Sequence, residues 1–177
     1  FNITVKEASD FLNIFSPELR IASNANIKGH FLEKDANFLL DISSEWLEFR
    51  NYRVENIDMR HSMDTNNLAA SYHFTDVKIK DTSYFSDVFF SGDGSDNLLH
   101  SNLSWGQHTI NESSVEWDTK IMDWTHFDFT LEPSYISLKE LKWNLLDASN
   151  FNLSNDTLTV KDFLLSKADQ SIALNGI

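Results

Sequence analysis

Cysteine is absent from this chain of 177 residues, and proline and glycine are scarce, with two and five residues respectively. The lack of cysteine excludes disulfide scaffolds, thiolate zinc sites and cysteine nucleophiles. It leaves the cellular compartment open, because exported proteins without cysteine are also common. The few glycines form no Gly-rich loop of the kind that holds a phosphate group.

Positive charge is also scarce, since 14 Lys and Arg stand against 27 Asp and Glu, for a net charge of −13. This balance argues against a nucleic-acid-binding protein and against docking onto anionic lipid headgroups through a polybasic patch. No apolar run approaches the roughly 18 residues of a membrane span, and no signal peptide is visible. The chain begins at Phe1 and ends inside an alternating run, so we expect residues 1–177 to be one internal segment of a longer protein.

Aromatic residues are plentiful, with 14 Phe, five Trp and four Tyr, and 41% of the chain is apolar, which is typical of a folded protein. Apolar residues alternate with polar ones over most of the chain from about residue 19 to 177, as in Phe38, Leu40 and Ile42. This alternation predicts antiparallel strands with one apolar and one solvated face. Residues 5–15 instead show helical spacing and predict one short helix.

A weak internal repeat of 30 residues accompanies the alternation. Asparagine precedes a strand-like run at Asn37, at Asn67 and at Asn97. Thirty residues accommodate two strands and their turns, and repetition on this scale favours a stacked all-β array over a closed barrel.

No catalytic or metal-binding constellation is visible. The six histidines never pair at metal-ligand spacing and are interpreted as residues of strand faces. The acidic run from Asp93 to Asn97 lacks the spacing of a calcium-binding loop, and Ser91–Ser95 does not form a nucleophile elbow. We therefore expect a protein that is not an enzyme and that uses no cofactor and no metal.

The last 50 residues carry an ordered set of short motifs. Pro133-Ser134-Tyr135-Ile136 is followed by Trp143-Asn144-Leu145, then by Val160-Lys161-Asp162-Phe163-Leu164-Leu165 and by Gln170-Ser171-Ile172-Ala173-Leu174-Asn175-Gly176. Near the start, Pro17-Glu18-Leu19 leads to Ile27-Lys28-Gly29. In this order the motifs resemble the TamB family, the translocation and assembly module subunit, in its Bacteroidetes form.

The resemblance implies a specific architecture and function. TamB proteins are similar to AsmA-like bridge lipid-transfer proteins. Their fold is a β-taco, a long sheet curled into an open trough with an apolar interior. The family is anchored in the bacterial inner membrane, spans the periplasm, conducts phospholipid and supports protein secretion and outer-membrane protein assembly. Its partner is an Omp85-type outer-membrane barrel, which would meet parts of the parent protein outside this segment.

The residues support one part of this mechanism independently, because an apolar sheet face must be buried against something and a single helix cannot cover it. We expect acyl chains to lie in a groove lined by Phe38, Leu40, Ile42, Leu68, Tyr72, Phe74, Val88, Phe90, Phe127, Phe129, Leu131, Trp143 and Leu145. The alternative is a β-sandwich adhesin or carbohydrate-binding module at the cell surface. Exposed end strands also predict strand-edge self-association of the fragment.

Overall fold

The computed structural model describes residues 1–6, 16, 18–32, 37–123, 125–138 and 140–176. These residues form fifteen β-strands and no helix, which confirms the all-β class expected from the alternation. The helix expected over residues 5–15 is wrong at its first residue, because Val5 ends strand β1, where the β-branched side chains of Ile3 and Thr4 favour extended backbone. Residues 7–15 lie outside the described residues.

The chain divides into two compact units, Phe1–Phe90 and Ser91–Ile177, and strand β7 runs from the first into the second. The strands of the first unit are β1 (Asn2–Val5), β2 (Leu19–Ile21), β3 (Ala25–Leu32), β4 (Asn37–Phe49), β5 (Tyr52–Met63), β6 (Asn67–Ile79) and the first part of β7 (Thr82–Ser95). The other strands belong to the second unit: β8 (Leu98–Trp105), β9 (Ser113–Asp123), β10 (His126–Leu131), β11 (Ser134–Leu138), β12 (Leu141–Leu145), β13 (Ser149–Ser154), β14 (Thr157–Lys167) and β15 (Gln170–Gly176).

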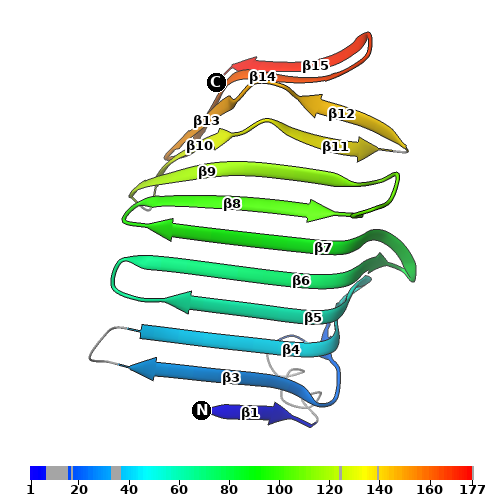
Figure 1. Cartoon of the computed structure of the whole chain (residues 1–177), viewed down its shortest axis with the longest axis vertical. Coiled ribbons are helices and arrows are strands. Elements are labelled where there is room, and N and C mark those ends of the chain that lie inside the picture. The colour runs from blue at the N-terminus through cyan, green and yellow to red at the C-terminus, as the bar shows by residue number, and fades with distance from the viewer. Residues whose placement is uncertain (7–15, 17, 33–36, 124, 139, 177) are drawn as a thin grey trace. The chain divides into compact units, whose positions relative to one another are not determined.

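The first unit is an antiparallel sheet in the order β1-β3-β4-β5-β6-β7 (Figure 1). Strand β2 adds to the end of β4, where Leu19 pairs with Phe49. Strands β4, β6 and β8 begin at Asn37, Asn67 and Leu98, in step with the 30-residue period of the sequence.

The second unit is a meander in which two of the long strands are interrupted (Figure 1). Strands β10 and β11 both pair with β9. In addition, β13 pairs with β10, and β12 pairs with β11. Strand β14 then pairs with β13 and β12, and β15 pairs with β14. The first interruption falls at Glu132 and Pro133, where proline has no N–H group to donate to the neighbouring strand.

The turns show how a chain with five glycines makes its hairpins. Lys80 and Asp81 join β6 to β7 with positive φ angles of 50° and 64°, the combination of a type I′ turn. Asp96, Asn155 and Ala168 also have positive φ in the turns that precede β8, β14 and β15. Asn and Asp tolerate this left-handed backbone better than other side chains, which explains their abundance between the strands.

Three strands contain a left-handed residue in their interior, namely Asn56 in β5, Asp87 in β7 and Asp162 in β14. Each is followed directly by an apolar residue, and another apolar residue lies two positions before it. Asp162, for example, lies between Val160 and Phe163, which are three positions apart. A left-handed residue interrupts the regular alternation of side chains, so the spacing of the apolar residues changes from two to three at these points.

The consequence is visible around Asp162. Val160 pairs with Phe151 across the ladder, and the ring of Phe163 lies 6.0 Å from the ring of Phe151. Val160 and Phe163 therefore share one face although they are three residues apart. On the other side of β14, the register with β15 shifts at the same place, which identifies Asp162 as the extra residue of a β-bulge.

Buried apolar side chains are few and mostly small. In the part of the chain that the structure describes they are Ala22, Ala25, Ile57, Val88 and Leu145. Most of the large apolar side chains are half-buried or exposed instead, and they gather on one face of each unit.

Candidate functional site

The first unit has one continuous apolar face, which the strand register defines. Partners directly opposite one another in an antiparallel ladder share a face. The cross-strand rows are Ile27-Ile42-Met59-Tyr72, Gly29-Leu40-His61-Ala70 and Phe31-Phe38-Met63-Leu68. The register thus brings together the five predicted lining residues Phe38, Leu40, Ile42, Leu68 and Tyr72.

The remaining predicted residues of this unit lie on the same face. The ring of Phe90 stacks on that of Tyr72 with centroids 5.2 Å apart, which places the end of β7 beside β6 on this face. Val88 lies two residues before Phe90 and is buried, and Phe74 lies two residues after Tyr72 and is half-buried. Alternation along each strand therefore assigns Val88 and Phe74 to the apolar face as well.

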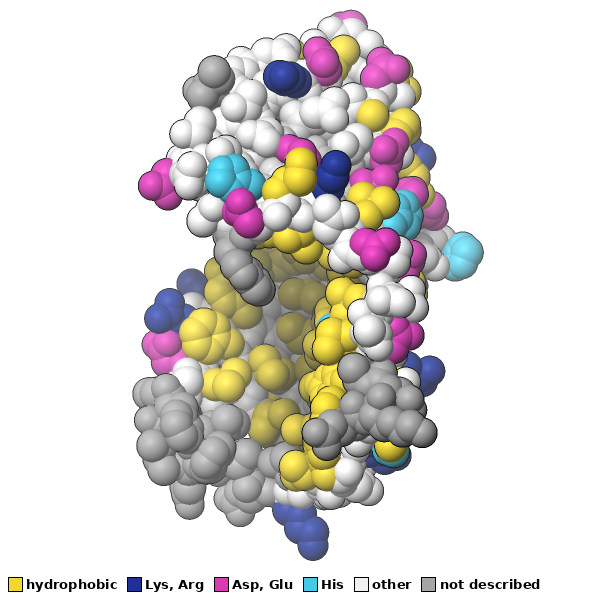
Figure 2. Space-filling model, turned by 90° about the vertical axis from the view of Figure 1, so that its left-hand side faces the viewer, with side chains coloured by type: hydrophobic (Ala, Val, Ile, Leu, Met, Phe, Trp, Pro, Cys, Tyr) yellow, Lys and Arg dark blue, Asp and Glu magenta, His cyan; other side chains and the backbone are white. Residues whose placement is uncertain are grey.

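The predicted lining omits several members of this face, above all Met59, His61 and Met63 in β5. The ring of His61 meets that of Phe38 edge-on at 6.4 Å, and its Nδ1 atom lies 3.4 Å from the Tyr72 hydroxyl. The sequence does show Met59, His61 and Met63 in alternation with polar residues, which is typical of a strand. Histidine and methionine, however, are weak indicators of an apolar strand face. In Figure 2 hydrophobic side chains line a hollow in the lower part of the view, where the first unit lies.

The second unit has an apolar face of its own. Its rows include Thr119-Phe129-Phe151-Val160 and Ile121-Phe127-Leu153-Leu158, and Leu131 lies opposite Trp117 and Ser149. The predicted residues Phe127, Phe129 and Leu131 thus share a face, and the rings of the two phenylalanines are stacked at 6.2 Å. The predicted lining omits Phe151 and Val160, although both lie within the part of the chain that was expected to form strands.

Trp143 and Leu145 extend this second face. Leu145 pairs with Leu165, and Leu165 follows Phe163 by two residues on the face that holds Phe151. Trp143 is half-buried and lies opposite Ile136 of β11, whereas Leu145 is 2% exposed. Leu145 is therefore a packing residue at the interruption of the strands and offers little surface to a ligand.

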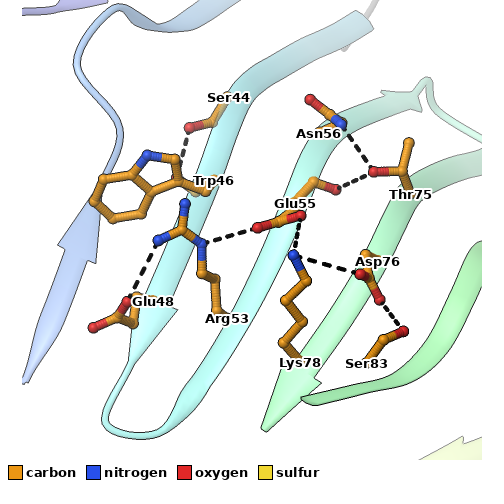
Figure 3. A network of polar contacts seen from close by, with 10 residues as sticks. All are labelled: Ser44, Trp46, Glu48, Arg53, Glu55, Asn56, Thr75, Asp76, Lys78 and Ser83. Carbon is orange, nitrogen blue, oxygen red and sulfur yellow. Dashed lines mark hydrogen bonds and ion pairs between the residues drawn. The ribbon is translucent and has the colours of Figure 1, made fainter. Parts of the chain in front are cut away.

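The opposite face of the first unit is polar. Figure 3 shows a network of charged side chains across β4, β5 and β6. Lys78 donates to Glu55 at 2.7 Å, Arg53 donates to the same carboxylate at 3.1 Å, and the guanidinium of Arg53 covers the ring of Trp46 at 4.7 Å. The hydrogen bond to Glu55 raises the pKa of Lys78. Trp46 is thus the base of a solvated charge network and lines no apolar groove.

The opposite face of the second unit is polar as well. Its rows of Asp, Lys, Asn and Thr side chains line an open hollow of about 680 Å³, with Asp118, Lys120, Asp128, Thr130, Asn150, Asn152, Thr159 and Lys161 among its residues. Two pairs among them are hydrogen-bonded, as Asn152 donates to Asp128 at 2.5 Å and Thr130 to Asn150 at 3.2 Å. The two aspartates and two lysines of the hollow balance in charge.

The loop between β8 and β9 is fixed by a half-buried hydroxyl–carboxylate contact. The Tyr135 hydroxyl donates to Glu112 at 2.6 Å, which lowers the pKa of Glu112 and raises the pKa of Tyr135. The side chain of Ser137 donates to the Glu112 carbonyl at 2.7 Å. These bonds attach β11 to the loop. This structural role is sufficient to explain the contact between Tyr135 and Glu112, and no chemical role has to be assigned to it.

Within the described ranges, no group of three or more His, Asp or Glu side chains could hold a metal ion. The same residues include no helix that is long and apolar enough to cross a membrane. Comparison with protein-family models, with curated proteins and with solved structures finds no match. The two apolar faces are the candidate functional site.

Proposed function

We propose that the apolar face of each unit is the lining of a lipid-binding trough, and that the chain is a segment of a TamB-like lipid-transfer protein. In this proposal each sheet curls in the manner of a β-taco, with the apolar face inside and the polar face in water. The groove holds phospholipid acyl chains and guides them along the sheet. It performs no chemical reaction and requires no cofactor.

One observation carries the proposal: the described residues supply no second layer to cover either apolar face. Phe31 and Met63, which belong to the rows of the first unit, are 62% and 46% exposed, and Leu158 of the second unit is 50% exposed. Apolar faces of this extent usually mark a binding surface. The small number of fully buried apolar residues points the same way, since a self-sufficient domain of this length buries more of them.

The energetics suit acyl chains. Each methylene group that leaves water contributes roughly 0.8 kcal/mol, so a chain of a dozen carbons gains about 10 kcal/mol before the costs of binding are subtracted. This gain needs no polar recognition, in agreement with faces on which Phe, Leu, Ile, Met, Val and Tyr side chains predominate. A groove of this kind also explains why the chain shows no catalytic motif.

The setting of the proposal comes from the resemblance to TamB proteins. It assigns the chain to the periplasm, its parent to the inner membrane, and contact with an Omp85-type barrel to other parts of the parent. The alternative of a β-sandwich or carbohydrate-binding module gains little support, because the strands of each unit belong to one hydrogen-bonded sheet and Trp46 lies in the charge network rather than on a free sugar platform.

Adjacent residues of β4 provide the test. Leu40 pairs with Gly29 and His61 on the apolar face, whereas Leu39 pairs with His30 and Ser62 on the polar face. In a lipid-uptake assay with a fluorescent fatty acid, Leu40→Glu is expected to lose most of the binding of the parent chain, and Leu39→Glu to retain it. Circular dichroism confirms that both variants are folded. Absence of uptake by the unmodified chain, or equal uptake by folded forms of both variants, would refute the proposal.

A further inference from the structure

Lys167 lies at the margin of the apolar face of the second unit. Strand β14 places Leu165 opposite Leu145 and Ser166 opposite Asn144, so Lys167 comes next to Trp143 on the apolar face. Its ammonium group lies 5.9 Å from the centre of the Trp143 ring. Lys167 is also the last residue of β14, directly before the turn at Ala168, and its side chain is half-buried.

Among the described residues this ammonium group has no carboxylate partner, since Lys167 forms no ion pair within 4.0 Å. Arg50 offers a contrast in the first unit, because it also lies over an aromatic ring, that of Phe49 at 5.2 Å, but its Nε atom is 2.5 Å from Glu18. The charge of Arg50 is compensated, whereas that of Lys167 is free to meet an anion.

The position of Lys167 suits a particular kind of anion. A lysine can lay its methylene groups along an apolar surface and hold its charge at the edge of that surface, in water. A tryptophan beside it offers an apolar ring with one polar edge, the combination that is enriched where acyl chains meet headgroups. The other neighbours on this face, Ile136 and Leu165, are apolar and would contact the acyl chain.

We propose that Lys167 and Trp143 form a headgroup station, in which Lys167 binds the phosphate of a lipid whose acyl chain lies on the apolar face of the second unit. This inference rests on the proposed function and makes it more specific, because it assigns the phosphate of the lipid a binding residue and the lipid an orientation. The phosphate lies at the β14–β15 turn, and the acyl chain extends from Trp143 over Leu165 toward Phe163 and Phe151.

The test compares two lipids with the same acyl chain, lauroyl lysophosphatidic acid and lauroyl glycerol, below their aggregation concentrations. Binding to the full chain is measured by isothermal titration calorimetry. We expect the phosphate-bearing lipid to bind about fivefold more tightly, the preference that one partly exposed ion pair provides. Lys167→Met is expected to abolish this preference while it keeps binding of lauroyl glycerol, and Lys167→Arg to retain it.

Lys161→Met is the matched control, because Lys161 lies in the same strand but lines the polar hollow on the opposite face. It is expected to leave the preference unchanged. Equal binding of both lipids by the unmodified chain, or a preference that survives Lys167→Met, overturns the headgroup station and leaves the trough intact. Failure of both lipids to bind overturns the proposed function itself. Inorganic phosphate is titrated as a last ligand. If it binds tightly and neither lipid binds, the site is an anion site unrelated to lipid.

Discussion

At the scale of single residues, the charge of His100 is set by two neighbouring carboxylates. Its Nδ1 atom lies 2.7 Å from Asp118 and its Nε2 atom 3.2 Å from Glu116, on the polar face of the second unit. The hydrogen bond to Asp118 raises the pKa of His100 above 6.5, and the carboxylates of Glu116 and Asp93 act in the same direction against partial burial. The folded chain therefore holds this proton more tightly than the unfolded chain does.

This linkage predicts a pH dependence of stability. Because the pKa is higher in the folded state, the stabilising contribution of His100 is complete below pH 6.5 and is lost as the pH rises through the folded-state value. The imidazole resonance of His100 in an NMR titration should have its midpoint above 6.5, and Asp118→Asn should lower that midpoint. Urea unfolding at several pH values should show a decline over this window that His100→Gln reduces. An unshifted midpoint would contradict the prediction.

At the scale of strands, the left-handed residues explain both the success and the failure of the alternation rule. Alternation correctly gathers Phe38, Leu40 and Ile42 on one face, because β4 has no left-handed residue among them. In β14 the same rule would separate Val160 from Phe163, and the bulge at Asp162 reunites them. The repeated order of an apolar residue, any residue, Asn or Asp, and an apolar residue was visible in the sequence. Its meaning depends on a φ angle, which periodicity does not reveal.

The bulge predicts which of two neighbouring residues matters for stability. Phe163 contacts Phe151 on the apolar face, whereas Leu164 is 48% exposed on the other side of β14. Phe163→Ser should lower the free energy of unfolding by about 2–3 kcal/mol, since half-burial reduces the usual cost of removing a phenylalanine. Leu164→Ser should cost less than about 1 kcal/mol. Urea unfolding followed by circular dichroism measures both, and the reverse order would show that alternation continues through Asp162.

Other parts of the site were beyond prediction for physical reasons of a different kind. Strand register between residues far apart in the chain determines the rows that join β10 to β13. It also determines the position of the Lys167 ammonium group beside Trp143. Register follows from turn geometry and from interruptions such as the one at Pro133, and one residue of slip would exchange the faces. The sequence could therefore predict apolar strand faces, but it could not predict which residues on different strands become neighbours.

At the scale of the whole molecule, the net charge of −13 opposes the compact state, because excess carboxylates repel one another across the polar faces. The observed ion pairs are mostly exposed, as in Arg50 with Glu18 and Arg60 with Asp58, and pairs of this kind contribute about 0–1 kcal/mol each. Repulsion should therefore dominate the effect of salt on stability.

Raising sodium chloride from about 0.01 M to about 0.1 M shortens the screening length from about 30 Å to about 10 Å, and should raise the melting temperature. Each kcal/mol of relief corresponds to about 2–4 °C for a chain of this size. The variant Asp81→Asn, Asp96→Asn, Asp156→Asn removes three exposed charges and keeps side chains that tolerate the left-handed φ angles of 64° and 55° at Asp81 and Asp96. It should melt higher than the parent at low salt and respond less to added salt, whereas Asn51→Asp should do the opposite. A melting temperature that falls with added salt would contradict this prediction, because it would mean that the ion pairs outweigh the repulsion. The charge network around Glu55 would then be the main electrostatic contribution to the stability of the fold.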